Sequence, residues 1–250
     1  GVAAAFSNVW NYGGWFPNGT MVFILSFQMV VFAFTGIELV GLTAGETENP
    51  EKVIPMAINN IPLRIILFYI GSLAIIMSIY PWTAVNPAAS PFVAVFTAVG
   101  ITAAAGIVNF VVLTSAASAT NSGIFSTGRM IYALAKRGHA PKSMRRLTHS
   151  SVPYQATIFS AAVLLITVVL NYVMPEAVFV MITSISTFCF IFIWAIMVIC
   201  HLKYRKKNSE LAANSKFKMP LYPVMNSLIL AFFAFILIIL ALNDDTRVAL

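Results

Sequence analysis

The chain has 250 residues, of which 60% are hydrophobic and 9% are charged, and its formal net charge is +7. In a soluble domain about a quarter of the residues are charged, so this composition excludes a water-soluble globular protein. A chain this apolar is also unlike a disordered protein. With a mean hydropathy of +0.89, the chain is predicted to be an integral membrane protein. At about 20 residues per span plus loops, six or seven helices fit this length.

Long apolar runs predict six membrane-spanning helices, because lipid offers backbone groups no hydrogen-bond partner. The predicted spans are residues 21–43, 61–82, 101–135, 156–173, 177–202 and 221–242. A further apolar stretch, Phe92 to Val99, follows Pro91 and is too short to cross the bilayer. A transmembrane barrel would show alternating rather than continuous apolar residues. The predicted fold class is therefore an all-α integral membrane protein.

The two ends of the sequence bear on its completeness. The chain starts at Gly1 without a basic and apolar leader, and it stops shortly after the last apolar run closes at Asn243. We expect it to be a piece of a longer membrane protein that lacks the preceding helices.

The loop charges predict how the helices are oriented. The loops at residues 136–153 and 203–218 are rich in Lys and Arg, whereas the loops Thr83–Ser90 and Asn171–Glu176 on the opposite side contain none. The positive-inside rule then places 136–153 and 203–218 in the cytoplasm of a multi-pass protein of the cell membrane. Residues 44–60 would lie on the same side. The apolar helices on either side of the basic run 203–207 make a nucleic-acid partner a poor interpretation.

Glu38 is an ionisable residue inside the first predicted span. Thr35 and Gly36 precede it, and glycine weakens a helix at that depth. We predict a broken helix near Gly36, whose freed carbonyls, from Val31 to Phe34, could accept hydrogen bonds from a substrate ammonium. The alternative is that Glu38 bonds to neighbouring helices and locks the bundle.

The third predicted span carries many small and hydroxylated residues between Asn109 and Arg129. Small residues allow membrane helices to approach closely, and this packing role is one interpretation. The other is that the same residues form the polar lining of a solute path. The sequence leaves both open.

Several chemical roles find no support in the sequence. The acidic segment 44–52 contains neither His nor Cys and is interpreted as a solvated loop, not a metal site. Cys189 and Cys200 lie in one apolar run and are interpreted as packed or lipid-facing thiols. Phosphate-binding, serine-hydrolase and zinc-protease motifs are missing, as are paired intramembrane carboxylates. We therefore expect no enzymatic activity, no cofactor and no bound metal.

Two long motifs resemble those of the amino-acid permeases in the amino acid–polyamine–organocation superfamily. One is residues 32–38 together with 45–52, and the other is residues 113–130. Shorter matches occur at 59–66, 218–220 and 244–247. Within the superfamily the motifs are most similar to those of the D-serine/D-alanine/glycine permeases, and the likeness covers essentially the whole chain.

The resemblance implies that residues 1–250 form part of one permease domain, helices six to eleven of a twelve-helix transporter. That fold contains two five-helix inverted repeats whose first helices are broken, in agreement with the break predicted near Gly36. It further implies proton symport of small neutral amino acids by alternating access, with the missing N-terminal helices completing the site. The alternatives are a permease for another neutral amino acid, or an amino-acid-binding channel or sensor.

The resemblance also implies roles for individual residues. Phe32 would be an aromatic gate over the substrate, and carbonyls near Phe32 and Thr35 would bind the α-ammonium group. Glu38 would stabilise the unwound region or communicate with gating. On the third span, three residues would line the site: Ser118, Asn121 and Ser122. The small Gly123 beside them suits a small substrate.

Overall fold

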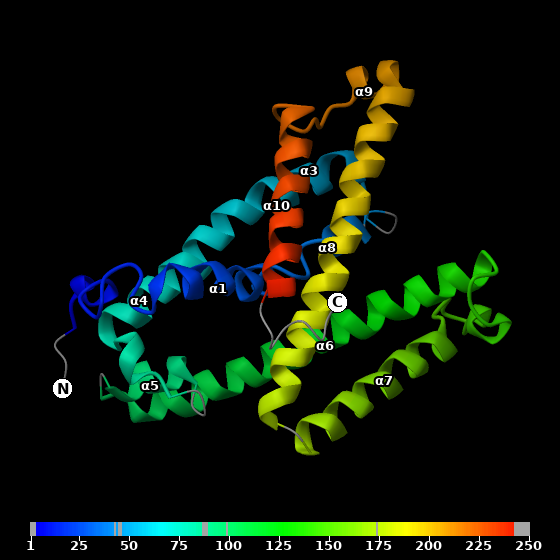
Figure 1. Ribbon diagram of the computed structural model, residues 1–250. Coiled ribbons are helices and arrows are strands. Elements are labelled where there is room, and N and C mark those ends of the chain that lie inside the picture. The colour runs from blue at the N-terminus through cyan, green and yellow to red at the C-terminus, as the bar shows by residue number, and fades with distance from the viewer. Residues whose placement is uncertain are drawn as a thin grey trace. The chain divides into compact units, whose positions relative to one another are not determined.

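The computed structural model describes residues 4–42, 44, 47–86, 90–98, 100–173 and 175–242 (Figure 1). All regular secondary structure within these residues is helical, which confirms the predicted all-α fold class. In chain order the elements are η1 (Phe6–Val9), α1 (Gly19–Ala33), α2 (Leu39–Leu42), α3 (Pro50–Arg64), η3 (Ile65–Ile70), α4 (Gly71–Ile79), η4 (Trp82–Ala84), α5 (Pro91–Ala98), α6 (Thr102–Lys136), η5 (Lys142–Arg145), α7 (Tyr154–Val173), α8 (Pro175–Lys207), α9 (Ser209–Asn214) and α10 (Val224–Leu242).

Five helical segments of the described chain are long and apolar enough to cross a membrane. They are Pro50–Ile79, Gly106–Lys136, Tyr154–Val173, Val178–Lys207 and Val224–Leu242. Each overlaps one of the last five predicted spans. The first predicted span, 21–43, contains the shorter apolar helix α1 and then the short helix α2; its last residue, Thr43, lies outside the described residues.

The second of the predicted spans belongs to a helix that begins earlier than the apolar run. Helix α3 starts at Pro50, and η3, a π-helical stretch, connects it to α4. The interpretation of the segment 44–52 as a loop is therefore wrong from Pro50 onward, because residues 50–52 are helical. Proline is well suited to the first helical position because its missing N–H has no partner there, and Glu51 in the first turn favours the helix dipole. Gly45 and Glu46 of the acidic segment lie outside the described residues.

The chain divides into two compact units, which are described separately. The first contains residues 1–17 and 60–169, and the second contains 18–59 and 170–250. In the first unit, the segment around η1 packs on α4. The Ser78 carbonyl accepts hydrogen bonds from the Ala5 amide at 3.0 Å and from Asn8 Nδ2 at 2.8 Å. Nearby, Trp82 Nε1 donates to the Tyr12 carbonyl at 3.1 Å.

Helix α6 makes three further contacts inside the first unit, with α5, α7 and η5. It packs against α5, and its buried Gly128 lies against Thr157 of α7. At its C-terminal end, Arg145 of η5 donates from Nε to the Ala135 carbonyl at 2.6 Å. The Ala135 carbonyl also accepts the Gly138 amide at 3.1 Å, and a cation at the C-terminal end complements the helix dipole. The basic segment after α6 is therefore folded back onto the helix end.

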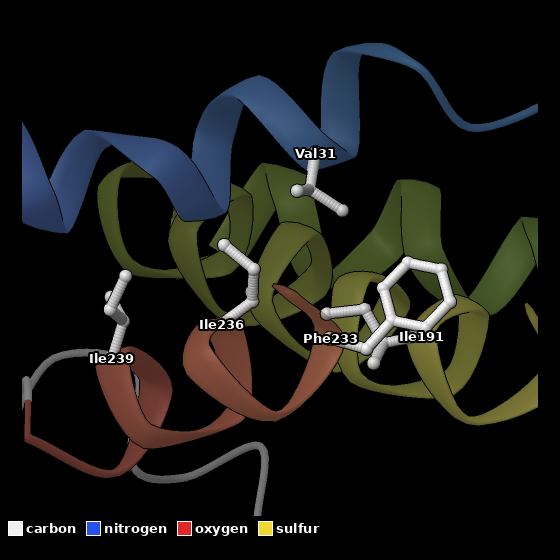
Figure 2. Packing of buried hydrophobic residues seen from close by; sticks show 5 residues of the cluster. All are labelled: Val31, Ile191, Phe233, Ile236 and Ile239. Atoms are coloured by element: carbon white, nitrogen blue, oxygen red, sulfur yellow. The ribbon is translucent and has the colours of Figure 1, made fainter. Parts of the chain in front are cut away.

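In the second unit, α1, α8 and α10 pack around an apolar cluster (Figure 2). Three members lie on one face of α10, at a spacing of three residues, and the other two come from α1 and α8. The members are Val31, Ile191, Phe233, Ile236 and Ile239. Aromatic rings extend this cluster, since Phe27 of α1 meets Phe235 edge to face with ring centroids 5.9 Å apart. This packing fixes the C-terminal half of α1, where the predicted site begins.

Candidate functional site

The candidate site is the interruption between α1 and α2. After Ala33 the helix tightens, and the Phe34 amide donates to the Val31 carbonyl at 3.1 Å. Gly36 then adopts φ +103°, a backbone conformation that residues with a Cβ rarely accept. Helix α2 begins at Leu39. The predicted break near Gly36 is therefore confirmed, and the glycine is its conformational cause.

Glu38 caps this break. Its carboxylate accepts the backbone N–H of Gly36, with Oε1 at 3.2 Å and Oε2 at 3.1 Å. An interrupted helix leaves amides without their usual partners, and a charged acceptor makes a strong replacement. Within the described residues no hydrogen bond or ion pair joins the Glu38 carboxylate to another helix. Of the two interpretations of Glu38, its contacts in this structure favour a local role at the unwound segment over locking the bundle.

The backbone carbonyls at the end of α1 accept hydrogen bonds within the chain, in contrast to the prediction that they are free. The Phe32 carbonyl accepts two hydrogen bonds, from the Thr35 amide at 3.0 Å and from Thr35 Oγ1 at 2.8 Å. Because a carbonyl oxygen has two lone pairs, this one is fully used. The prediction that the Val31 and Phe32 carbonyls are freed is therefore wrong for this conformation: the chain closes a tight turn on them. If the Thr35 hydroxyl rotated, the Phe32 carbonyl would lose one of these two hydrogen bonds.

A polar contact that the sequence reasoning missed lies one turn before Phe32. Gln28 is 6% exposed, and its Nε2 donates to Thr187 Oγ1 of α8 at 3.5 Å. That hydroxyl in turn donates to the Thr183 carbonyl at 2.8 Å. Gln28 and Phe32 are four residues apart and share a face of α1. The available signal was a lone amide side chain, Gln28, in an otherwise apolar run.

The remaining predicted site residues lie on α6, in the first unit. Ser118 and Asn121 are exposed, and Ser122 is half-buried. Ser122 Oγ donates to the Ser118 carbonyl at 3.0 Å, one turn earlier. The structure thus gathers Ser118, Asn121 and Ser122 in one turn of α6, and it gathers Phe32, Thr35, Gly36 and Glu38 at the break in the second unit.

The two interpretations of the small residues of α6 apply to different parts of the helix. At Gly128 the packing role is visible, because an added Cβ would lie 2.9 Å from Thr157 Oγ1 and 3.3 Å from Thr157 Cα. At Gly123 an added Cβ would meet nothing within 4 Å. Close packing against α7 therefore accounts for the end of the run and not for the exposed segment around Ser118.

Metal-binding groups are not assembled in the described part of the chain. No group of three or more His, Cys, Asp or Glu side chains comes together among those residues. Cys189 and Cys200 are exposed free thiols, in agreement with the lipid-facing interpretation. The chemistry that the described site offers is hydrogen bonding by backbone groups, hydroxyls and one carboxylate.

Comparisons with known proteins show which family the chain matches. The amino acid permease family model matches residues 1–249. The chain is 68% identical to the uncharacterized transporter YdgF and 66% identical to the amino-acid permease AapA, both of Bacillus subtilis, over 99% of its length. It is 52% identical to a D-serine/D-alanine/glycine transporter of Escherichia coli over its whole length.

The same comparisons show how much of each relative the chain covers. The chain spans 54% of the length of each of these relatives. No solved structure matches it. The five apolar helices and the family match identify a multi-pass protein of the plasma membrane, and the chain belongs to the amino acid permease family.

Proposed function

We propose that the chain forms about half of a secondary transporter that takes up small neutral amino acids of the D-serine, D-alanine and glycine type, by proton symport with alternating access. The observation that carries the proposal is the helix break at Gly36, whose amide is held by the Glu38 carboxylate. A discontinuous helix that presents backbone groups near an ionisable residue is how many secondary transporters build a site within the membrane.

The turn after α1 supplies groups for the substrate. Rotation of the Thr35 hydroxyl away from the Phe32 carbonyl would release an acceptor for the substrate ammonium. The Phe32 side chain, half-buried in the last turn of α1, is the proposed gate. Binding would then replace an internal hydrogen bond by one to substrate, which limits the cost of leaving a carbonyl unpaired.

Glu38 is the proposed link to the proton. As a carboxylate it makes charge-assisted hydrogen bonds to the Gly36 amide, and a protonated carboxyl would hold that amide more weakly. Protonation would thus loosen the segment between α1 and α2 and favour a change of its conformation. The coupling of a proton to this rearrangement is the mechanistic core of the proposal.

The proposed substrate size follows from α6 and from the relatives. Ser118, Asn121 and Ser122 would contribute small polar groups, and Gly123 leaves room beside them. The name of the Escherichia coli relative, a D-serine/D-alanine/glycine transporter, supports the same class. We propose that the part of the permease preceding this chain completes the site.

The test is uptake of labelled glycine and D-alanine by the full-length protein in vesicles with an imposed pH gradient. Glu38→Gln is expected to reduce gradient-driven uptake strongly while leaving membrane insertion intact. The exposed Glu48 provides a matched control, and Glu48→Gln is expected to leave uptake unchanged. Normal, gradient-dependent uptake by Glu38→Gln would remove Glu38 from the mechanism.

Two further measurements separate the alternatives. A competition panel of D- and L-amino acids tests the substrate, and failure of both D-serine and glycine to compete would point to a permease for another neutral amino acid. Exchange stimulated by substrate on the opposite side tests alternating access, since a channel or a sensor shows none. Trans-stimulated exchange is the expected result.

A further inference from the structure

Arg205, near the end of α8, stacks on an aromatic ring. Its guanidinium carbon lies 4.1 Å from the ring centroid of Tyr222, in the turn before α10. The same ring meets His201 edge to face, with centroids 5.7 Å apart. His201 and Arg205 are one helical turn apart and therefore share the α8 face that meets Tyr222. The arginine is thus held in place on this ring.

The histidine that meets this ring is itself anchored to a buried residue. His201 Nδ1 lies 3.0 Å from Nδ2 of Asn226, a fully buried residue in the first turn of α10. An amide nitrogen only donates, so Nδ1 is the acceptor of this bond. The same Nδ2 lies 3.5 Å from the Val198 carbonyl. A series of contacts therefore runs from the Arg205 guanidinium through Tyr222 and His201 to the buried Asn226. The Tyr222 ring is called the platform of Arg205 below.

Arg205 differs from the basic residues around it. Four of the five residues 203–207 are basic, but the three lysines are exposed whereas Arg205 is half-buried. Across the described chain, no Asp or Glu lies within ion-pair distance of Arg205. A guanidinium stacked by its face keeps its N–H groups along the edge, where they can bind an oxyanion in a fork. The Arg205 guanidinium is held in place, but the described residues supply no carboxylate to pair with it.

The depth of Arg205 indicates what that partner is. The apolar span Val178–Lys207 ends at this turn, and Ile196 and Ile199 are 45% and 41% exposed just before it. At a rise of 1.5 Å per residue, Arg205 lies about 9 Å beyond Ile199 along the helix. A cation at the end of an apolar span lies at the depth of the lipid headgroups and their phosphate groups.

We propose that Arg205, stacked on Tyr222, is a binding site for the phosphodiester group of an anionic phospholipid in the leaflet that the loop charges predict to be cytoplasmic. The guanidinium edge donates two hydrogen bonds to the non-bridging phosphate oxygens. The exposed lysines of residues 203–207 raise the local positive potential and disfavour the ammonium of a zwitterionic headgroup. This site is independent of the proposed transport function.

The test measures lipid binding, not uptake. The full-length protein is placed in nanodiscs of phosphatidylglycerol and phosphatidylcholine in equal parts, and retained phosphatidylglycerol is quantified by native mass spectrometry during delipidation. Arg205→Gln is expected to weaken retention about tenfold, and Arg205→Lys by a smaller factor, because it keeps the charge without the fork. Lys206→Gln removes the same charge at the same depth from another face of α8, and a change below about twofold is expected.

Each contrary outcome has a definite meaning. Equal losses for Arg205→Gln and Lys206→Gln would show unspecific attraction to a charged surface and overturn the site, as would unchanged retention in both. If Arg205→Gln does not fold, Tyr222→Leu removes the platform and retains every charge, and it is expected to lower retention as Arg205→Lys does. Inorganic phosphate at matched ionic strength should not displace the lipid; displacement would identify free phosphate as the ligand instead.

Discussion

The carboxylate of Glu38 holds the backbone amide of Gly36, two residues earlier in the chain, with both oxygens within 3.2 Å of the nitrogen. The ionisable residue and the helix break are therefore one structural unit. Changing the charge of the carboxyl acts directly on the segment that interrupts the helix. In the proposed mechanism, this contact would connect protonation of the carboxyl to a rearrangement of the backbone without any intermediate group.

Replacing Gly36 tests the backbone conformation of the break. An added Cβ at this position would meet nothing within 4 Å, so the penalty arises from φ +103° alone. Gly36→Ala is expected to cost about 1–3 kcal/mol in stability of the full-length protein, measured by thermal unfolding in detergent. Gly41 is the control, since it lies in α2 and an added Cβ is equally unhindered. Gly41→Ala should be neutral or stabilising, and equal losses in both would contradict the strain argument.

Replacing Gly128 tests the close approach of α6 and α7. The new Cβ would lie 2.9 Å from Thr157 Oγ1 and 3.4 Å from the Thr157 backbone nitrogen, and backbone cannot move aside cheaply. Gly128→Ala should therefore lower stability by about 1–3 kcal/mol. On the same helix, Gly123→Ala meets no atom within 4 Å and should be neutral or slightly stabilising through helix propensity. A stable Gly128→Ala protein would show that the helices separate without cost.

The buried pair Gln28 and Thr187 should respond asymmetrically. Thr187→Val leaves the buried Gln28 amide without its partner, whereas Gln28→Leu leaves the Thr187 hydroxyl bonded to the Thr183 carbonyl. An unsatisfied buried polar group costs about 1–3 kcal/mol, so Thr187→Val should destabilise more than Gln28→Leu. The double variant should be more stable than Thr187→Val alone. Thermal unfolding of the three proteins measures this, and strictly additive effects would show that the 3.5 Å contact carries no energy.

The exposed ion pair between Lys216 and Glu51 should have little effect at neutral pH. Their charged atoms are 2.8 Å apart, but the side chains are 81% and 77% exposed. The hydrogen bond to Glu51, and secondarily its charge, raise the pKa of Lys216. The hydrogen bond to Lys216, and secondarily its charge, lower the pKa of Glu51. The pair's contribution is therefore present between the ordinary glutamate and lysine pKa values, and it is lost as the pH rises through the raised Lys216 value or falls through the lowered Glu51 value.

Lys216→Gln should leave the unfolding temperature at pH 7 close to that of Lys218→Gln, the matched control in the same loop, because solvent screens exposed pairs. Stability of the parent protein should not change between pH 7 and 9 through this pair. A large, salt-sensitive loss specific to Lys216→Gln would contradict this view and assign the loop a structural role.

Much of the local structure could be read from residue patterns. The apolar runs predicted the long helices because lipid leaves the backbone no other way to satisfy its hydrogen bonds. Gly36 predicted the break because glycine weakens a helix, and the structure adds that its φ of +103° is the conformation that interrupts it. The start of α3 was missed because hydropathy reports the apolar part of a helix, while Pro50 begins its polar end.

The sequence by itself determined that this is a helical membrane protein with an interrupted helix and a carboxylate beside the interruption. Only the tertiary structure decided which distant residues meet: Gln28 with Thr187, Gly128 with Thr157, and Arg205 with Tyr222. The physical reason is that span formation depends on transfer of a whole segment into lipid, which composition describes. Hydrogen bonding and close packing depend on rotamers and on neighbours that are distant in sequence, which no pattern along the chain records.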